Sequence, residues 1–182
     1  MRIIGGYLKG RRFKVPKNFH SRPTTDFAKE GLFNVLDNYF VLENKNVLDL
    51  CSGTGNISFE FVSRGAAKVT CVDSNYSSFR FIKQNATSLK ITNAISIVKS
   101  DIIKFVKTVN KEYDFIFADP PYKFDKYHEL INITCIKSSA LNENGVFILE
   151  HGKDYNFESH SFFSFSKKYG NVYFSFFEKK IS

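Results

Sequence analysis

Short apolar runs alternate with segments of helical periodicity along most of the chain. The runs predict buried strands over residues 44–50, 67–73, 94–100, 113–119 and 145–151. Between them, helical spacing predicts helices over 56–64, 77–89 and 126–138, with a short one ending near residue 109, and an earlier helix capped by Thr24 or Thr25. Because strands and helices alternate, we predict parallel βαβ units in an α/β, Rossmann-like, doubly wound sheet.

The two ends of the chain depart from this alternation. The C-terminal stretch "HSFFSFSKKYGNVYFSFFEK" alternates aromatic and polar residues around the turn "KKYGN", which predicts a hairpin that adds an antiparallel strand. Residues 2–15 predict a small N-terminal β-hairpin that ends at Pro16. We find no internal repeat or linker, so we expect one domain over 1–182, made of a basic extension (1–24) and a core (25–182) that holds the chemistry described below.

The composition is that of a globular protein, with 43% hydrophobic and 24% charged residues among 182. No apolar run reaches the roughly 18 residues of a membrane span, and the first residues lack the apolar centre of a secretory signal. The three cysteines form no C-x-x-C pair, which indicates reduced thiols and a cytoplasmic protein. The four histidines show no ligand spacing, so we expect no metal site.

Positive charge is concentrated at the N-terminal end. The net charge is +8, and residues 1–29 carry eight basic side chains against one acid, Asp26. The eight are Arg2, Lys9, Arg11, Arg12, Lys14, Lys17, Arg22 and Lys29. A basic arm on a nearly neutral body favours nucleic acid over a merely solvated surface. The predicted nucleic-acid contacts are Arg2, Lys9, Arg11, Arg12, Lys14 and Arg22.

Acidic residues and glycines follow successive predicted strands. Asp49 lies in the strand of "VLDLCSGTGN", and Gly53 and Gly55 form the turn after it. A lone G-x-G also fits any tight strand–helix connection, but Asp73 and Asp101 follow the next two strands. The carboxyl ends of parallel strands meet at one edge, so the three acids converge.

An acid-rich edge repels phosphates and suits a nucleoside that carries positive charge, as S-adenosylmethionine does. Its predicted contacts are Asp49, Ser52, Gly53, Gly55, Asn56, Asp73, Ser74, Asp101 and Ile102.

A fourth acid ends the strand in "FIFADPPYKF". Pro120 and Pro121 stop the sheet ladder and hold Asp119 on a stiff turn, followed by Tyr122. The turn could simply end a strand, with its tyrosine packed on the core. The functional interpretation, which we favour, makes Asp119, Pro120, Pro121 and Tyr122 the catalytic segment. The Asp119 carboxylate and the Pro120 carbonyl would accept the two hydrogens of an exocyclic amine, and Tyr122 would stack on its base.

These motifs carry a family resemblance. "LDLCSGTGN", "VD", "SD" and "DPPY", in this order, resemble the class I S-adenosylmethionine-dependent methyltransferases. "MRIIGGYLKGRRFKVP" followed by "RPTTDFAKEGLFNVL" resembles the RsmD family, which methylates the exocyclic N2 of a guanine in 16S ribosomal RNA. Lys29 stands where that family usually has arginine, and Asn56 where it usually has a small residue.

The resemblance implies S-adenosylmethionine as cofactor and 16S rRNA, free or within the small ribosomal subunit, as partner. Two alternatives stay open: an adenine-N6 methyltransferase acting on DNA or RNA, and a non-catalytic RNA-binding protein on the same fold. The first usually carries a separate target-recognition domain, for which 182 residues leave no room. The sequence indicates neither the modified nucleotide nor the oligomeric state.

Overall fold

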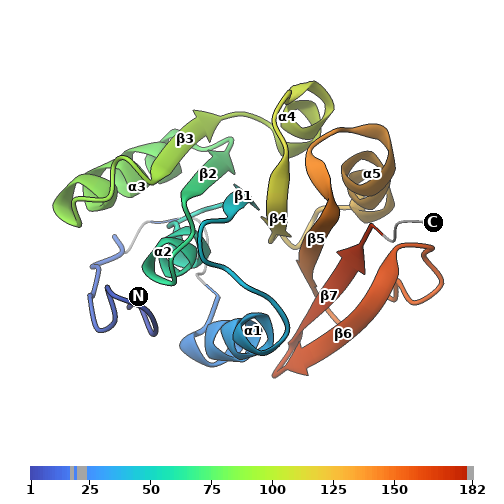
Figure 1. The fold of residues 1–182 in the computed structure, drawn as a ribbon, viewed down its shortest axis with the longest axis horizontal. Helices are drawn as coiled ribbons and strands as arrows, with labels where there is room; N and C mark the ends of the chain where they lie inside the picture. Colours follow the sequence, from blue (N-terminus) through green and yellow to red (C-terminus); the bar gives the residue numbers. More distant parts are fainter. Residues whose placement is uncertain (17–18, 20–23, 180–182) are drawn as a thin grey trace.

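A seven-stranded sheet with helices on both faces forms the body of the molecule (Figure 1). The computed structural model describes residues 1–16, 19 and 24–179. The strands are β1 (Asn46–Leu50), β2 (Lys68–Asp73), β3 (Ile95–Lys99), β4 (Tyr113–Ala118), β5 (Leu141–His151), β6 (Phe163–Tyr169) and β7 (Val172–Glu178). Their order is β3-β2-β1-β4-β5-β7-β6. Strands β1 to β5 pair in parallel, and β7 is antiparallel to both β5 and β6, so the predicted fold class is confirmed.

The helices divide between the two faces of the sheet. One apolar cluster joins α1 (Asp26–Tyr39), α2 (Asn56–Ser63) and α3 (Tyr76–Ser88) to the sheet. The other joins α4 (Ile102–Thr108) and α5 (Tyr127–Asn132) to the opposite face. The predicted helix over 126–138 is interrupted, because α5 continues as a π-helical turn (Ile133–Lys137). Thr25 rather than Thr24 caps α1, since its hydroxyl accepts from the amide of Ala28 at 3.2 Å.

The strand order places four carboxyl ends along one edge of the sheet. β1 lies between β2 and β4, and β5 lies on the other side of β4. The residues that end or follow these strands therefore share one region, as the acids after successive strands predicted. The edge brings together Asp73 at the end of β2, the glycine loop after β1, and Asp119 after β4.

The N-terminal arm (residues 1–16) turns back on itself as a short hairpin, in which backbone hydrogen bonds of 2.9–3.0 Å join Met1 and Ile3 to Gly10, Arg11 and Phe13. A single bridge joins Arg2 and Arg12. Further along, two arm amides donate instead to the Glu60 carboxylate on α2, at 2.9 and 2.7 Å. A Cβ on Gly6 would lie 1.7 Å from the Ser63 carbonyl oxygen, and φ there is +68°, so only glycine fits. The arm is thus docked on α2 through its backbone, as its position beside α2 in Figure 1 shows.

Lys29, which the charge count placed with the basic arm, is not a surface cation. Its side chain is fully buried, and Nζ donates to the Arg2 carbonyl at 2.5 Å and to Asn56 Oδ1 at 2.8 Å. Nζ also lies 3.4 Å from the carboxylate of Glu60, which is equally buried. Burial lowers the pKa of Lys29, whereas Glu60 and Asp26 raise it. The lysine ties the arm, α1 and α2 together and is unavailable to an external anion.

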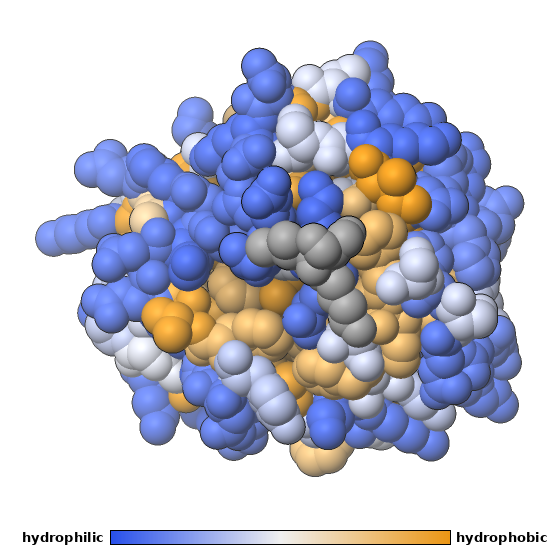
Figure 2. Space-filling model, turned by 45° about the vertical axis from the view of Figure 1, so that its right-hand side comes forward, coloured by the Kyte–Doolittle hydropathy of each residue, from blue (hydrophilic) through white to orange (hydrophobic). Residues whose placement is uncertain are grey.

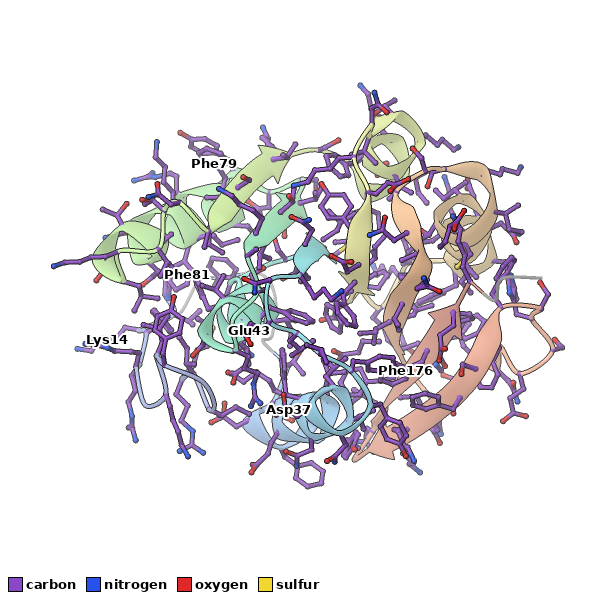
Figure 3. All side chains as sticks on the ribbon, in the orientation of Figure 1. Lys14, Asp37, Glu43, Phe79, Phe81 and Phe176 are labelled. Carbon is purple, nitrogen blue, oxygen red and sulfur yellow. The ribbon has the colours of Figure 1, made fainter. Side chains whose placement is uncertain are left out.

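Other cations of the arm stay on the surface. Lys9, Arg11, Arg12 and Lys14 are exposed, and Figure 3 shows Lys14 pointing away from the body. Arg2 is half-exposed and pairs with Asp26 at 2.8 Å, which neutralises part of its charge. Arg22 and Lys17 lie outside the described residues.

Polar residues dominate the outer surface. On the face drawn in Figure 2, hydrophilic residues form most of the periphery, and hydrophobic residues gather nearer the middle. Among the residues described, no helix combines the length and the apolarity needed to cross a bilayer.

Candidate active site

A cavity of about 550 Å³ opens at the carboxyl edge of the sheet. The ends of β1, β2, β3 and β4, together with the segment before α1, contribute its walls. Of the predicted cofactor and catalytic residues, it is lined by Asp49, Ser52, Gly53, Asn56, Asp73, Ser74, Asp101, Ile102, Asp119, Pro120, Pro121 and Tyr122. Residues predicted separately for two ligands therefore share one cavity.

Asp73 fixes the conformation of the loop after β1 through a hydrogen bond to its backbone. One Asp73 carboxylate oxygen accepts the amide of Gly53 at 2.8 Å, and the other accepts the amide of Asn75 at 2.7 Å. Each oxygen keeps a lone pair after its backbone bond, so the carboxylate can still accept from hydroxyl groups in the cavity. Gly53 has φ of +51° and Gly55 has φ of +72°, the left-handed region in which glycine is favoured.

Gly55 does not line the cavity. A Cβ on it would come within 3.0 Å of Ile82 and 3.1 Å of Phe59, so its role is the close approach of α2 to α3. Asn56 lines the cavity but uses its side chain internally: Oδ1 accepts from Lys29, and Nδ2 donates to the Thr24 carbonyl at 3.0 Å.

Asp49 is a buried carboxyl group at the back of the cavity. It is 1% exposed, and the Ser58 hydroxyl donates to it. Burial raises the pKa of Asp49 to about 7, while the bond from Ser58 acts in the opposite direction. Ser58 of α2 is thus the hydrogen-bond partner of this carboxyl group. A positively charged ligand nearby would favour its ionised form.

Asp101 lies at the third strand end and serves two purposes. Its carboxylate caps α4 by accepting the amide of Lys104 at 2.9 Å, and it also lines the cavity. Burial is the largest cause that raises the pKa of the Cys51 thiol. The charges of Asp119, Asp73, Asp49 and Asp101 raise it further, because all four lie near this thiol.

Asp119 directly follows β4 and lines the cavity. Its amide donates to the Leu50 carbonyl at 3.3 Å, which ties it to the loop after β1. Burial raises the pKa of the Asp119 carboxyl group to about 7. The Phe124 amide donates to the Pro121 carbonyl at 2.7 Å and closes the turn.

The rest of the turn presents polar and aromatic groups outward. Tyr122 is 90% exposed, so the alternative in which it packs on the core is wrong. Within the described part of the chain, the Pro120 carbonyl accepts none of the hydrogen bonds found and is available to a ligand.

Ten lining residues were not predicted from the sequence: Phe19, Thr24, Cys51, Thr54, Ile57, Asn75, Ser78, Ser100, Phe117 and Phe124. Of these, Phe19 and Thr24 precede α1 and lie far in the sequence from the strand ends. Phe19 packs edge-on against Phe81 of α3, with ring centroids 5.5 Å apart, and it lines the cavity together with Thr24. A signal existed for Thr24, which stands beside the predicted helix cap, but none indicated that Phe19 and Thr24 lie against the strand ends. No group of three or more potential metal ligands occurs among the residues that the structure describes.

Known proteins share this sequence and architecture. The family model "Conserved hypothetical protein 95" matches residues 1–178. Ribosomal RNA small subunit methyltransferase D of Buchnera aphidicola subsp. Baizongia pistaciae is 33% identical over 86% of this chain and 78% of its own length. The rRNA methyltransferase homologue YlbH of Bacillus subtilis is 32% identical over 85% of this chain and 84% of its own length.

Solved structures of other proteins share this fold. The structure of yhhF from Escherichia coli superposes with a TM-score of 0.84 and 26% identity, covering 100% of this chain and 99% of that one. The T. thermophilus 16S rRNA methyltransferase RsmC, solved with AdoMet and guanosine, shares the fold at a TM-score of 0.72 and 20% identity, over 88% of this chain and 45% of that one. The chain therefore belongs to the RsmD family of S-adenosylmethionine-dependent methyltransferases.

Proposed function

We propose that this protein transfers a methyl group from S-adenosylmethionine to the exocyclic N2 of a guanine in 16S ribosomal RNA. The names of its relatives support small-subunit rRNA as the substrate. The observation that carries the proposal is that Asp119 and Pro120, two hydrogen-bond acceptors, line the same cavity as Asp49, Asp73 and Asp101.

Cavity residues at the ends of β1 and β2 fit the cofactor. Asp73 is fixed by two backbone amides and can accept from ribose hydroxyls. A nearby positive charge would favour the ionised form of Asp49, because burial otherwise disfavours that form. Bound S-adenosylmethionine supplies such a charge and an electrophilic methyl group. An anionic phosphate would meet only repulsion from these carboxylates.

The turn after β4, which holds Asp119, Pro120 and Tyr122, suits an exocyclic amine. The lone pair of a guanine amine is delocalised into the ring, so the amine is a weak nucleophile. When the Asp119 carboxylate and the Pro120 carbonyl accept its two hydrogens, the nitrogen can direct its lone pair into the cavity. The exposed ring of Tyr122 can stack on the same base, which contributes about 1–3 kcal/mol.

The arm supplies the contact with RNA. Lys9, Arg11, Arg12 and Lys14 are exposed on a segment that is anchored to α2, so these cations are presented from a fixed backbone. Their positive charges would bind phosphates without reading sequence. A base paired inside a helix would have to swing out to reach Asp119.

Single-turnover transfer of a labelled methyl group tests the role of Asp119. Asp119→Ala should lower the transfer rate by about 10²–10³, while calorimetry finds cofactor affinity within a few fold of wild type. Asp119→Asn should retain more activity than the alanine variant, because an amide oxygen still accepts a hydrogen bond. Asp125→Asn, an exposed acid on the same turn, is the matched control. A near-wild-type rate for Asp119→Ala would remove Asp119 from the mechanism.

A further inference from the structure

A second carboxyl group lies beside Asp119 at the adjacent strand end. Phe117 of β4 pairs in register with Ile148 of β5, and both side chains enter the core on the side of α1. Residues two positions further along a strand point to the same face, so Asp119 and Glu150 lie side by side on that face. Sequence reasoning did not single out Glu150, because it precedes neither a glycine loop nor a helix.

Glu150 is enclosed. It is 7% exposed, and the Thr24 hydroxyl donates to its Oε2 at 3.1 Å. Thr24 lines the cavity together with Asp119, so Glu150 contacts the wall of the site from behind. None of the salt bridges among the described residues involves it. A buried carboxyl group with no paired cation is unusual and calls for a physical account.

The neighbours of Glu150 disfavour a second negative charge. Just past the end of β4, Asp119 lies beside it, and on β7 it pairs with Phe174, which carries no charge. Burial first, and then Asp119, raise the pKa of Glu150 well above its ordinary value. From α5, Tyr127 has its pKa raised to about 12, mainly by burial, with Tyr155, Asp119, Cys51 and Glu150 adding to the effect. Ionising both of two adjacent buried carboxyl groups costs free energy, because the two like charges repel each other with little solvent between them.

We propose that Asp119 and Glu150 act as a pair that shares one proton, with Glu150 as a positioning residue that holds the proton and leaves Asp119 as the single carboxylate facing the amine. The role of the pair in methyl transfer rests on the proposed function, whereas the shared proton does not. When the amine nitrogen bonds the methyl carbon, the carbon–sulfur bond breaks with its electron pair remaining on sulfur. The nitrogen then gives up one proton, which Asp119 accepts. The pair is then neutral until that proton passes to solvent.

Through Thr24, Glu150 is also connected to the start of α2. Thr24 donates to Glu150 through its hydroxyl and accepts from Asn56 at the start of α2 through its carbonyl. An uncharged Glu150 can still accept from Thr24 through its carbonyl oxygen, more weakly than a carboxylate does, without adding charge beside Asp119. Glutamine reproduces this state, since it has the same length and an acceptor oxygen.

Infrared difference spectroscopy of the cofactor-free protein at pH 8 tests the shared proton without any substrate. Wild type minus Glu150→Gln should show the carbonyl band of a protonated carboxyl group. Wild type minus Glu158→Gln, an exposed control, should show only carboxylate bands. In Asp119→Asn the Glu150 band should remain, but its titration should shift to lower pH because the adjacent charge is gone. Absence of the acid band, or an unshifted titration, would overturn the proposal.

Methyl-transfer rates test the positioning role. Glu150→Ala, which leaves Thr24 without its partner, should lower the rate about tenfold or more. Glu150→Gln should lower it far less, with cofactor affinity similar in both variants. Equal losses in the two variants would show that an ionised Glu150 is required and would refute the shared proton. If wild type modified no guanine while the acid band was present, the proposed substrate would fail and the carboxyl pair would stand.

Discussion

The raised pKa of Asp119 predicts that the methyl-transfer rate depends on pH near neutrality. Burial raises this pKa from 3.8 to about 7. Only the ionised carboxylate accepts both from the amine and, later, its proton, so activity should rise as pH increases through 7. The ionised fraction is ~9% at pH 6 and ~91% at pH 8, so kcat/KM for RNA should rise about tenfold between them and level off above pH 8.

The assay is a pH series of kcat/KM at saturating S-adenosylmethionine. Saturation matters because Asp49 also has a pKa of about 7 and lies on the cofactor side of the cavity, so its titration should alter cofactor affinity. Asp119→Asn cannot titrate and should give a slower but flat profile over the same range. A wild-type profile that stays flat down to pH 5.5, or an unchanged acid limb in Asp119→Asn, would refute the reasoning.

Three further changes probe the cofactor wall, the arm and the buried network. Asp73→Ala should weaken cofactor binding by about 1–3 kcal/mol in calorimetry, since it removes a charged acceptor held by two amides; unchanged affinity would exclude Asp73 from the site. Replacing Arg11 and Arg12 by alanine should reduce the log–log salt slope of RNA binding by roughly 0.7 for each phosphate that the arm no longer neutralises, with cofactor affinity unchanged; an unaltered slope would make these residues solvated surface. Lys29→Ala should destabilise the protein by about 1–3 kcal/mol in urea unfolding, because the Arg2 carbonyl and Asn56 Oδ1 lose their donor while Glu60 keeps Arg64 and two arm amides; unchanged stability would contradict the assigned contacts.

The sequence predicted the edge of the sheet where the site lies because its signals are local. Apolar runs mark the strands, and a strand that ends in an acid places that acid at the carboxyl edge whatever the rest of the fold does. Asp49, Asp73 and Asp119 were therefore found from their own surroundings in the chain, and the structure gathers them around one cavity.

Residues that depend on pairings distant in the sequence were not predicted. A count of charges treats every lysine as solvated, so Lys29 was grouped with surface cations although Glu60 and Asn56 hold it inside. Glu150 becomes the neighbour of Asp119 only because β5 pairs with β4, and alternation of strands and helices does not specify which strands are adjacent. The N-terminal hairpin was predicted, but its attachment to α2 was not, because the amides of Ile4 and Gly5 bond to Glu60, which lies far from them in the sequence.

Product mapping tests the central claim most directly. Small ribosomal subunits and free 16S rRNA that lack the modification would be incubated with the protein and labelled S-adenosylmethionine, then digested to nucleosides. We expect label in N2-methylguanosine at a single position, and disappearance of that label with Asp119→Ala but not with Asp125→Asn. Label in N6-methyladenosine, or transfer that does not require Asp119, would contradict the claim.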